Sequence, residues 1–245
     1  MIDRVRGTVR RRILVNYRVD PDIARRQLPP GFEPKLVGGY ALGGVCLIRL
    51  EHERPFPAPR VMGLSSENVA HRFAAVRVDE RGVRRDCVYI PRRHSSSGLM
   101  RALGGRAFPG EPGRAKFGIH EDDTSIDISV STDDGFGAVI RARRASLLPA
   151  SSVFSSLIEA SAFVRDGSLG YSETRSGRRL DALQLEAARW SVVPLAVDVV
   201  RSTYFEDATL FPDGTVAFDC ALLMTDIEHA WRRMPPILRS ECATR

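Results

Sequence analysis

The chain has 245 residues, 43% of them hydrophobic and 27% charged, and its formal net charge is +6. These values are typical of a soluble globular protein and exclude the disordered, collagen-like and disulfide-rich classes. A chain of this length can bury a core that needs no metal or disulfide to hold it together, and nothing in the composition requires a cofactor.

The basic residues are almost all arginines, since only Lys35 and Lys116 are lysines. The arginines are scattered among acidic residues, and no nucleic-acid-binding motif accompanies them. Apolar runs such as 41–50 are far shorter than the roughly 20 residues that a membrane-crossing helix needs, and no apolar segment follows the arginine-rich N-terminus as it would in a signal peptide. We therefore expect a cytoplasmic protein that binds neither nucleic acid nor membranes.

The four cysteines, Cys46, Cys87, Cys220 and Cys242, are too widely spaced to form a metal knuckle or a disulfide framework. This spacing favours small buried side chains, with a free thiol near the tail. The five histidines also lack the spacing of metal ligands, so we expect no metal site.

The first predicted elements are a strand and a short helix. Residues 12–19 alternate weakly and lead into Asp20, which can cap a helix over 21–28 whose first turn tolerates a proline. The helix must end at Pro29-Pro30, because proline disfavours helical geometry in the residue before it. The helix has few apolar residues on one face, so we expect the helix to lie on the surface of a sheet.

From residue 34 onward, segments of two-residue alternation are separated by turns rich in Gly, Asp and Pro. We predict strands over 40–50, 68–78, 83–90, 115–119, 125–131 and 137–142. The same signature of strand and turn occurs over 209–224, around the turn signal at 212–214. The total of roughly nine or ten strands is more than one open sheet usually holds without curling.

Helical periodicity occurs in two further stretches. One starts at a capping serine, Ser151 or Ser152, and runs through Val164 to Gly167. The other covers 96–103 and ends at a Gly-Gly pair, a common way to leave a helix. No internal repeat or linker marks a boundary, so we predict one β-rich domain over residues 1–245.

Several segments resemble the acetoacetate decarboxylase-like superfamily. Residues 13–22 and 24–34 are similar to its first strand and helix, which carry a Tyr-Arg-Thr-Asp segment and a Leu-Pro or Val-Pro stop. Residues 65–68 lie where the decarboxylases have a Thr-Glu-Ser segment. Residues similar to the uncharacterised YqjF-like branch of the superfamily are 85–93, Trp190 and 229–231.

The resemblance implies a mainly β fold, an antiparallel cone-shaped β-barrel with two or three accessory helices and a central ligand cavity. In the decarboxylases a lysine forms a Schiff base with the substrate, and an arginine and a glutamate line the cavity. By the resemblance, these two fall on Arg18 and Glu67, whereas the two lysine positions are occupied by Gly110 and Glu111. Because an imine requires a primary amine, we do not expect simple acetoacetate decarboxylation.

Lys116 is the lysine that could replace the missing amine. In the segment 115–119 the apolar residues are 115, 117 and 119, so alternation turns Lys116 away from the face that they bury. We favour a solvated Lys116, because lysine is rarely buried. If the apolar residues instead pack outward against a helix, Lys116 points into the barrel. Lys35 is a weaker candidate.

Glu67 is the leading catalytic candidate. Burial in an apolar barrel raises the pKa of a carboxyl group and a nearby arginine lowers it, which can leave the group able to transfer a proton near neutral pH. Arg18 would then hold the acid group of the substrate. The alternative is a structural ion pair between Arg18 and Glu67.

Five further residues are candidates for substrate binding: Tyr89, Arg92, His94, Lys116 and His229. The run that starts at Arg92 precedes a helix and could hold an anion there, although such runs are more often solvated turns. His229 lies beside a tryptophan, where a structural histidine is the common outcome.

We therefore expect an enzyme that performs acid/base chemistry on a small carbonyl or carboxylate compound. The alternatives are a protein that binds a small molecule without catalysis, and a Schiff-base decarboxylase or aldolase that uses Lys116. We also expect a homo-oligomer.

Overall fold

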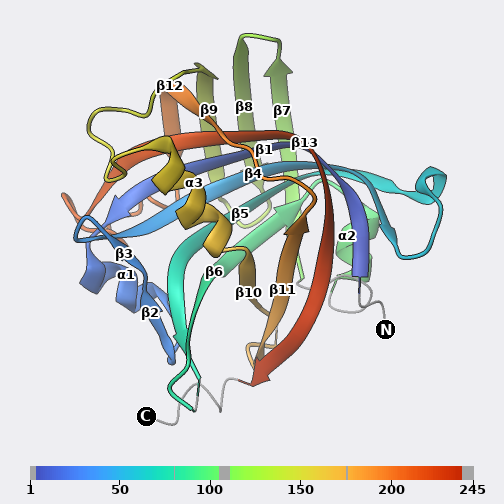
Figure 1. The fold of residues 1–245 in the computed structure, drawn as a ribbon, viewed down its shortest axis with the longest axis horizontal. Coiled ribbons are helices and arrows are strands. Elements are labelled where there is room, and N and C mark those ends of the chain that lie inside the picture. Colours follow the sequence, from blue (N-terminus) through green and yellow to red (C-terminus); the bar gives the residue numbers. More distant parts are fainter. Residues whose placement is uncertain (1–3, 80, 105–110, 175, 239–245) are drawn as a thin grey trace.

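The computed structural model describes residues 4–79, 81–104, 111–174 and 176–238 (Figure 1). The fold is mainly β, with three α-helices and one short 3-10 helix, η1. In chain order the elements are β1 (Arg4–Val19), α1 (Pro21–Gln27), β2 (Phe32–Pro34), β3 (Leu36–Val37), β4 (Tyr40–Pro55), η1 (Arg60–Met62), β5 (Leu64–Val78), β6 (Arg84–Ser95), α2 (Gly98–Leu103), β7 (Gly113–Glu121), β8 (Ser125–Thr132), β9 (Gly137–Arg144), α3 (Leu157–Asp166), β10 (Leu169–Glu173), β11 (Arg179–Ala187), β12 (Val193–Ser202) and β13 (Val216–Leu238).

The strands pair into a closed ring of nine, in the order β6, β7, β8, β9, β12, β13, β1, β4 and β5, with β5 pairing back to β6. Strands β10 and β11 bridge β6 and β13, which closes a second, smaller ring over the same central strands. Most pairings are antiparallel, as expected, but β6 pairs in parallel with both β7 and β10. Figure 1 shows the long central strands β13, β1, β4 and β5 curving across the molecule, with β7, β8 and β9 projecting beyond them.

The central strands bury side chains on both faces, which explains their nearly continuous apolar sequences. On β1, the neighbours Ile13 and Leu14 point to opposite faces and are both fully buried. Ile13 belongs to the core that also contains Ile128 of β8. Leu14 belongs to a second core, covered by α3 through Ala160 and Val164. Each central strand therefore contributes to two cores.

The helices confirm the predicted caps in part. Asp20 caps α1, and the helix ends before Pro29-Pro30 as predicted. Helix α2 begins at Gly98, with Ser97 as its cap. The predicted start of the third helix is wrong, because Ser156 caps α3. The reason is a buried carboxylate: Asp219 accepts hydrogen bonds from the Ser152 hydroxyl and from the amide of Val153, both at 2.8 Å, which holds this stretch in a non-helical conformation.

The strand predictions fail mainly in the last third of the chain. Strands β10, β11 and β12 were not predicted. In the segment 209–224 the predicted turn at 212–214 is present and is followed by β13, which runs from 216 to 238, but residues 203–215 form turns, so no strand precedes that turn. Three cysteines are buried and free, as predicted, namely Cys46, Cys87 and Cys220. Cys242 lies outside the described residues.

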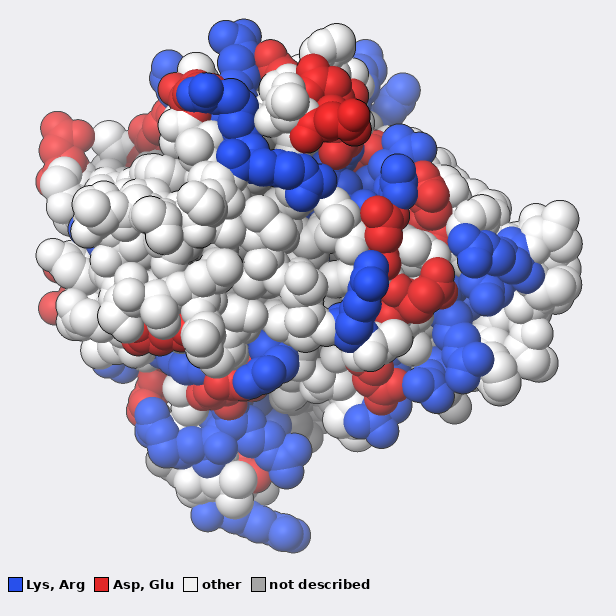
Figure 2. All heavy atoms as spheres, turned by 45° about the horizontal axis from the view of Figure 1, so that its top comes forward, with Lys and Arg blue, Asp and Glu red and all other residues white. Residues whose placement is uncertain are grey.

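The surface carries both signs of charge. Figure 2 shows Lys and Arg interspersed with Asp and Glu around the edges of this face, beside a broad area without charged residues. The net charge of +6 is therefore not gathered into one basic surface on this side. Within the described ranges, no helix has the length and hydropathy of a transmembrane span.

Candidate functional site

A cavity of about 150 Å³ lies between the central strands and β11, at the end of the molecule where α2 is located. Its walls are mostly apolar, with Val5, Ile48, Leu50, Val88, Leu183 and Trp231 among the lining residues. They come from β1, β4, β6, β11 and β13, which all belong to the smaller ring of strands.

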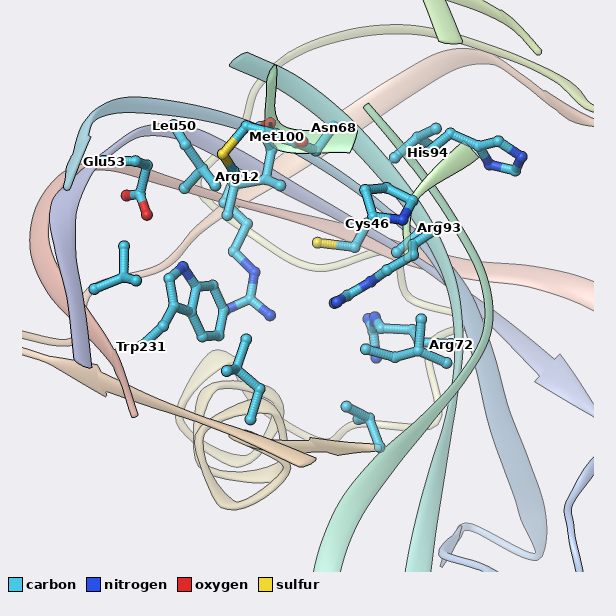
Figure 3. A pocket seen from close by; sticks show the side chains of 18 residues that line it. Arg12, Cys46, Leu50, Glu53, Asn68, Arg72, Arg93, His94, Met100 and Trp231 are labelled. Atoms are coloured by element: carbon cyan, nitrogen blue, oxygen red, sulfur yellow. Dashed lines mark hydrogen bonds between the residues drawn. The ribbon is translucent and has the colours of Figure 1, made fainter. Parts of the chain in front are cut away.

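Three arginines enter this apolar cavity. Arg12 comes from β1, Arg72 from β5 and Arg93 from β6. In Figure 3 the side chain of Arg12 enters beside Trp231, and those of Arg72 and Arg93 enter from the other side. Three guanidinium groups in one small cavity are unusual, because burying a charge is costly unless a partner compensates it.

Arg72 is the most deeply buried of the three, with 5% of its surface exposed. One of its Nη atoms donates a hydrogen bond to Oδ1 of Asn16. Among the described residues no carboxylate pairs with it, and its Nε, like Nε and Nη1 of Arg12, is buried without a hydrogen-bond partner. Burial, together with the nearby positive charge of Arg12, lowers the pKa of Arg72 to about 10. These buried donors have no acceptor among the residues that the structure describes.

Arg93 has a different environment. Burial lowers the pKa of its guanidinium, and the carboxylate of Asp181 acts in the opposite direction. Asp181 is itself buried on β11, where it also lies 3.2 Å from Nε of Arg179. Asp181 therefore compensates part of the charge of Arg93.

The carboxylate in the cavity wall is Glu53 of β4, which lies opposite a buried histidine. Its Oε1 is 3.0 Å from Nε2 of His229 on β13, and the two side chains are 1% and 0% exposed. Gly7 of β1 makes room for Glu53, since a Cβ at that position would lie 1.9 Å from Oε1. The ring of His229 meets that of Trp231 edge to face, with centroids 5.4 Å apart. Glu53 is thus held between His229 and the cavity.

The predicted pair of Arg18 and Glu67 does not form. Oε2 of Glu67 lies 2.7 Å from Nη2 of Arg11, and Oε1 lies 3.4 Å from Nη1 of Arg49. Arg18 is seven residues further along β1 than Arg11, roughly 23 Å at strand spacing, and its Nε lies 3.7 Å from Asp219.

Neither residue of that predicted pair lines the arginine cavity. Asn68 does line it, and because neighbouring strand residues point to opposite faces, Glu67 points away. Burial raises the pKa of Glu67, and Arg11 and Arg49 act against that shift. Burial therefore raises the pKa of Glu67 as predicted, but the arginines that lower it are Arg11 and Arg49 and not Arg18.

The other candidates divide into two groups. His94 lines the cavity at its margin, with Nε2 3.0 Å from Oδ1 of Asp134, and His229 reaches the cavity through Glu53. Tyr89 and Arg92 do not line it. Tyr89 alternates with the lining residues of β6 and donates a hydrogen bond to Glu173 at 2.8 Å, and Arg92 points outward to Asp134.

The two lysines also lie away from the cavity. Lys116 is exposed on β7, as its strand position predicted, and Nζ of Lys35 lies 2.6 Å from Asp86. None of the described residues that line the cavity is a lysine. Gly110 lies outside the described residues, and Glu111 is half-buried in the segment before β7.

Comparison with known proteins gives a family. Residues 6–220 match the model of DUF2071, described as an uncharacterized conserved protein (COG2071). The chain belongs to this family. No curated protein matches it.

The DUF2071 chain is similar to several solved structures. An acetoacetate decarboxylase from Legionella pneumophila matches with a TM-score of 0.58 and 12% identity, over 95% of this chain and 87% of that one. An acetoacetate decarboxylase-like enzyme from Sphingomonas wittichii matches with a TM-score of 0.57 and 11% identity, over 97% and 93%. The enduracididine biosynthesis enzyme MppR, complexed with the condensation product of pyruvate and imidazole 4-carboxaldehyde, matches with a TM-score of 0.58 and 15% identity, over 97% and 89%. The predicted similarity of the fold to that of the acetoacetate decarboxylase-like proteins is confirmed.

A second depression, of about 560 Å³, lies at the other end of β1 in this DUF2071 chain. Its charged lining residues are Arg18 and Asp20, and its walls include the glycine turns at 38–39 and 214. Both charged side chains already have partners, because Arg18 lies beside Asp219 and Asp20 caps α1. The arginine cavity is therefore the better candidate site. In the described part of the chain, no cluster of three His, Cys, Asp or Glu residues is placed to hold a metal ion.

Sequence reasoning missed four residues of this site: Arg12, Glu53, Arg72 and, as a cavity residue, Arg93. The usable signal was Arg72, which interrupts an apolar strand at a position where alternation predicts burial. A buried arginine without a partner in sequence is a candidate ligand-binding residue. Glu53 and His229 carry no comparable signal, because they are far apart in sequence and meet only through strand pairing.

Proposed function

We propose that this protein is an enzyme that binds a small keto acid in the arginine cavity and performs acid/base chemistry on it. The observation that carries the proposal is the set of buried guanidinium groups, two of which have donors without a partner among the described residues. Guanidinium groups bind carboxylates through two parallel hydrogen bonds. The acetoacetate decarboxylase-like fold supports an enzyme, and the pyruvate-derived ligand of MppR supports a keto acid.

Glu53 is the proton-transfer group in this proposal. Its carboxylate faces the cavity and is backed by His229 at 3.0 Å, so it can accept a proton from a carbon next to the ligand carbonyl. The negative charge that develops on the carbonyl oxygen as the proton leaves is stabilised by the guanidinium groups. In this proposal Glu53, and not Glu67, transfers the proton. The cavity arginines, and not Arg18, bind the acid group of the substrate.

Proton NMR in D₂O tests this assignment. The wild type is incubated with pyruvate, acetoacetate and oxaloacetate, and exchange or loss of the C–H signals is compared with that in buffer. Glu53→Gln should lower the enzymatic rate by about 100-fold or more, the usual effect of losing a general base. Glu67→Gln, which also neutralises a partly buried carboxylate, should stay within about twofold of the wild type. If Glu67→Gln removes the activity and Glu53→Gln does not, the assignment is wrong.

A non-catalytic binding protein is the second candidate. The absence of a lysine among the described lining residues favours it, because Schiff-base chemistry then lacks its amine. It predicts that keto acids raise the melting temperature by mass action without any change in their NMR spectra. The exposed position of Lys116 argues against the third candidate, a Schiff-base enzyme that uses this residue.

A further inference from the structure

The positive charges in the cavity indicate how many carboxylates the ligand carries. We propose that the ligand is a small dicarboxylate of about four carbons, with one carboxylate bound by Arg12 and the other by Arg72 and Arg93. This inference rests on the proposed function, which requires only one carboxylate. It concerns the number of charges on the ligand and the distance between them.

Two of the three cavity arginines have no carboxylate partner among the described residues. Glu53 faces His229, and Asp181 compensates part of the charge of Arg93. Arg12 and Arg72 have no carboxylate partner among the described residues. A ligand with two carboxylates supplies an ion-pair partner to each of these two guanidinium groups. A monoanion would leave one of them buried without a counter-charge.

Arg12 and Arg72 start from well-separated positions on the sheet. Strand register places Arg12 opposite Ile48 of β4, which in turn lies opposite Asn68 of β5. Arg72 is four residues further along β5, so the two backbone positions differ by two strands and four residues. At spacings of about 4.8 Å and 3.3 Å, this corresponds to roughly 16 Å between Cα atoms. Figure 3 shows the two side chains entering from different sides of the cavity, which fits two anionic groups joined by a short chain.

The cavity is large enough for only a small ligand. A volume of about 150 Å³ equals that of a protein cavity known to hold benzene. Succinate has eight non-hydrogen atoms and two carboxylates at its ends, which fits a cavity of this size with cations at separate positions. The apolar walls contributed by Ile48, Val88 and Leu183 suit the carbon chain. Above neutral pH, inorganic phosphate is also mainly a dianion, but with both charges on a single group.

Isothermal titration calorimetry with isosteric ligands tests the inference. Succinate and its monoamide, succinamate, have the same number of non-hydrogen atoms and differ by one charge, and inorganic phosphate provides a compact dianion. We expect succinate to bind at least tenfold more tightly than either of the other two. Arg12→Met should lower the affinity for succinate to about that for succinamate. Arg141→Met, which removes an exposed arginine of β9 paired with Asp127, should leave it unchanged.

Each other outcome overturns a defined part of the account. Equal affinities for succinate and succinamate would refute the dicarboxylate and leave the proposed function standing. Tighter binding of phosphate would refute the separated carboxylates. If no anion binds and no keto acid reacts, the proposed function fails as well. The comparison of the three ligands uses the wild type, so it decides the question even if Arg12→Met does not fold.

Discussion

Arg72 shows how a binding residue can reduce the stability of a protein. Its guanidinium is buried beside another arginine, with a hydrogen bond to Asn16 and no carboxylate. Replacing a buried charge by an apolar side chain of similar volume is often neutral or stabilising. An apolar residue at this position would avoid the cost of removing a charged group from water. A role in ligand binding explains why the protein has an arginine here despite that cost.

We therefore predict that Arg72→Met stabilises the ligand-free protein. The free energy of unfolding should rise by about 1 kcal/mol, after allowance for the hydrogen bond lost by Asn16, which corresponds to roughly 2–4 °C in melting temperature. Thermal and urea denaturation measure this. Arg201→Met, a control at an exposed arginine paired with Glu206, should change the free energy by no more than about 0.5 kcal/mol. A clear loss of stability in Arg72→Met would mean that the arginine is structural.

His71 makes the stability dependent on pH. Its ring is fully buried between those of Phe136 and Tyr204, at centroid distances of 4.0 and 4.3 Å. Burial, with smaller contributions from Arg92 and His94, lowers the pKa of His71 to about 3, and Asp134 acts in the opposite direction. Between pH 6.5 and 3 the unfolded chain therefore binds a proton that the folded protein does not. The stabilisation is complete above pH 6.5 and is lost as the pH falls.

The corresponding experiment compares urea denaturation at pH 7.5 and pH 4.5. The wild type should lose roughly 3 kcal/mol more than His71→Phe over this interval, at about 1.4 kcal/mol per pH unit below 6.5. His120→Gln, a change at an exposed histidine, should behave as the wild type does. Parallel pH dependences of wild type and His71→Phe would show that His71 is protonated in the folded state.

At the scale of elements, the site depends on how closely β1 passes Glu53 of β4. Gly7 lies at this approach, beside an irregularity in the β1–β4 register. A methyl group at position 7 cannot fit while Glu53 keeps its place next to His229. Because Gly7 has no side chain, the carboxylate of Glu53, the candidate base, has room beside β1.

Gly7→Ala should consequently displace Glu53. We expect a loss of about 1–3 kcal/mol in the free energy of unfolding, as for other overpacked sites, together with a loss of keto-acid turnover similar to that of Glu53→Gln. Gly137→Ala is the matched control, since this strand glycine has its nearest atoms at 3.6 Å and tolerates a Cβ. Full activity of Gly7→Ala would show that Glu53 can move without consequence.

Elements with strong local signals were predictable from the sequence. Asp20 followed by Pro21 specifies the start of α1, and Pro29-Pro30 specifies its end. The start of α3 was not predictable, because it depends on a contact between Ser152 and Asp219, 67 residues apart. Local patterns define caps and turns, whereas such long-range hydrogen bonds emerge only in the folded chain.

At the scale of the molecule, the strands that were not predicted are the ones that complete the site. Strands β10 and β11 close the smaller ring, and Leu183 of β11 lines the cavity. Without these strands in the prediction, Arg12 and Arg72 had no cavity to face, and the resemblance directed attention to Arg18 and Glu67 instead. The sequence therefore predicted the fold and most of the central strands but not the position of the site.

The central claim is that the arginine cavity binds a small organic acid. A crystal structure of the protein grown with succinate tests it most directly. The account predicts density for the ligand in the cavity, with a carboxylate within hydrogen-bond distance of the guanidinium of Arg12 and the other near Arg72. An empty cavity, with succinate bound instead in the depression beside Arg18, would contradict it.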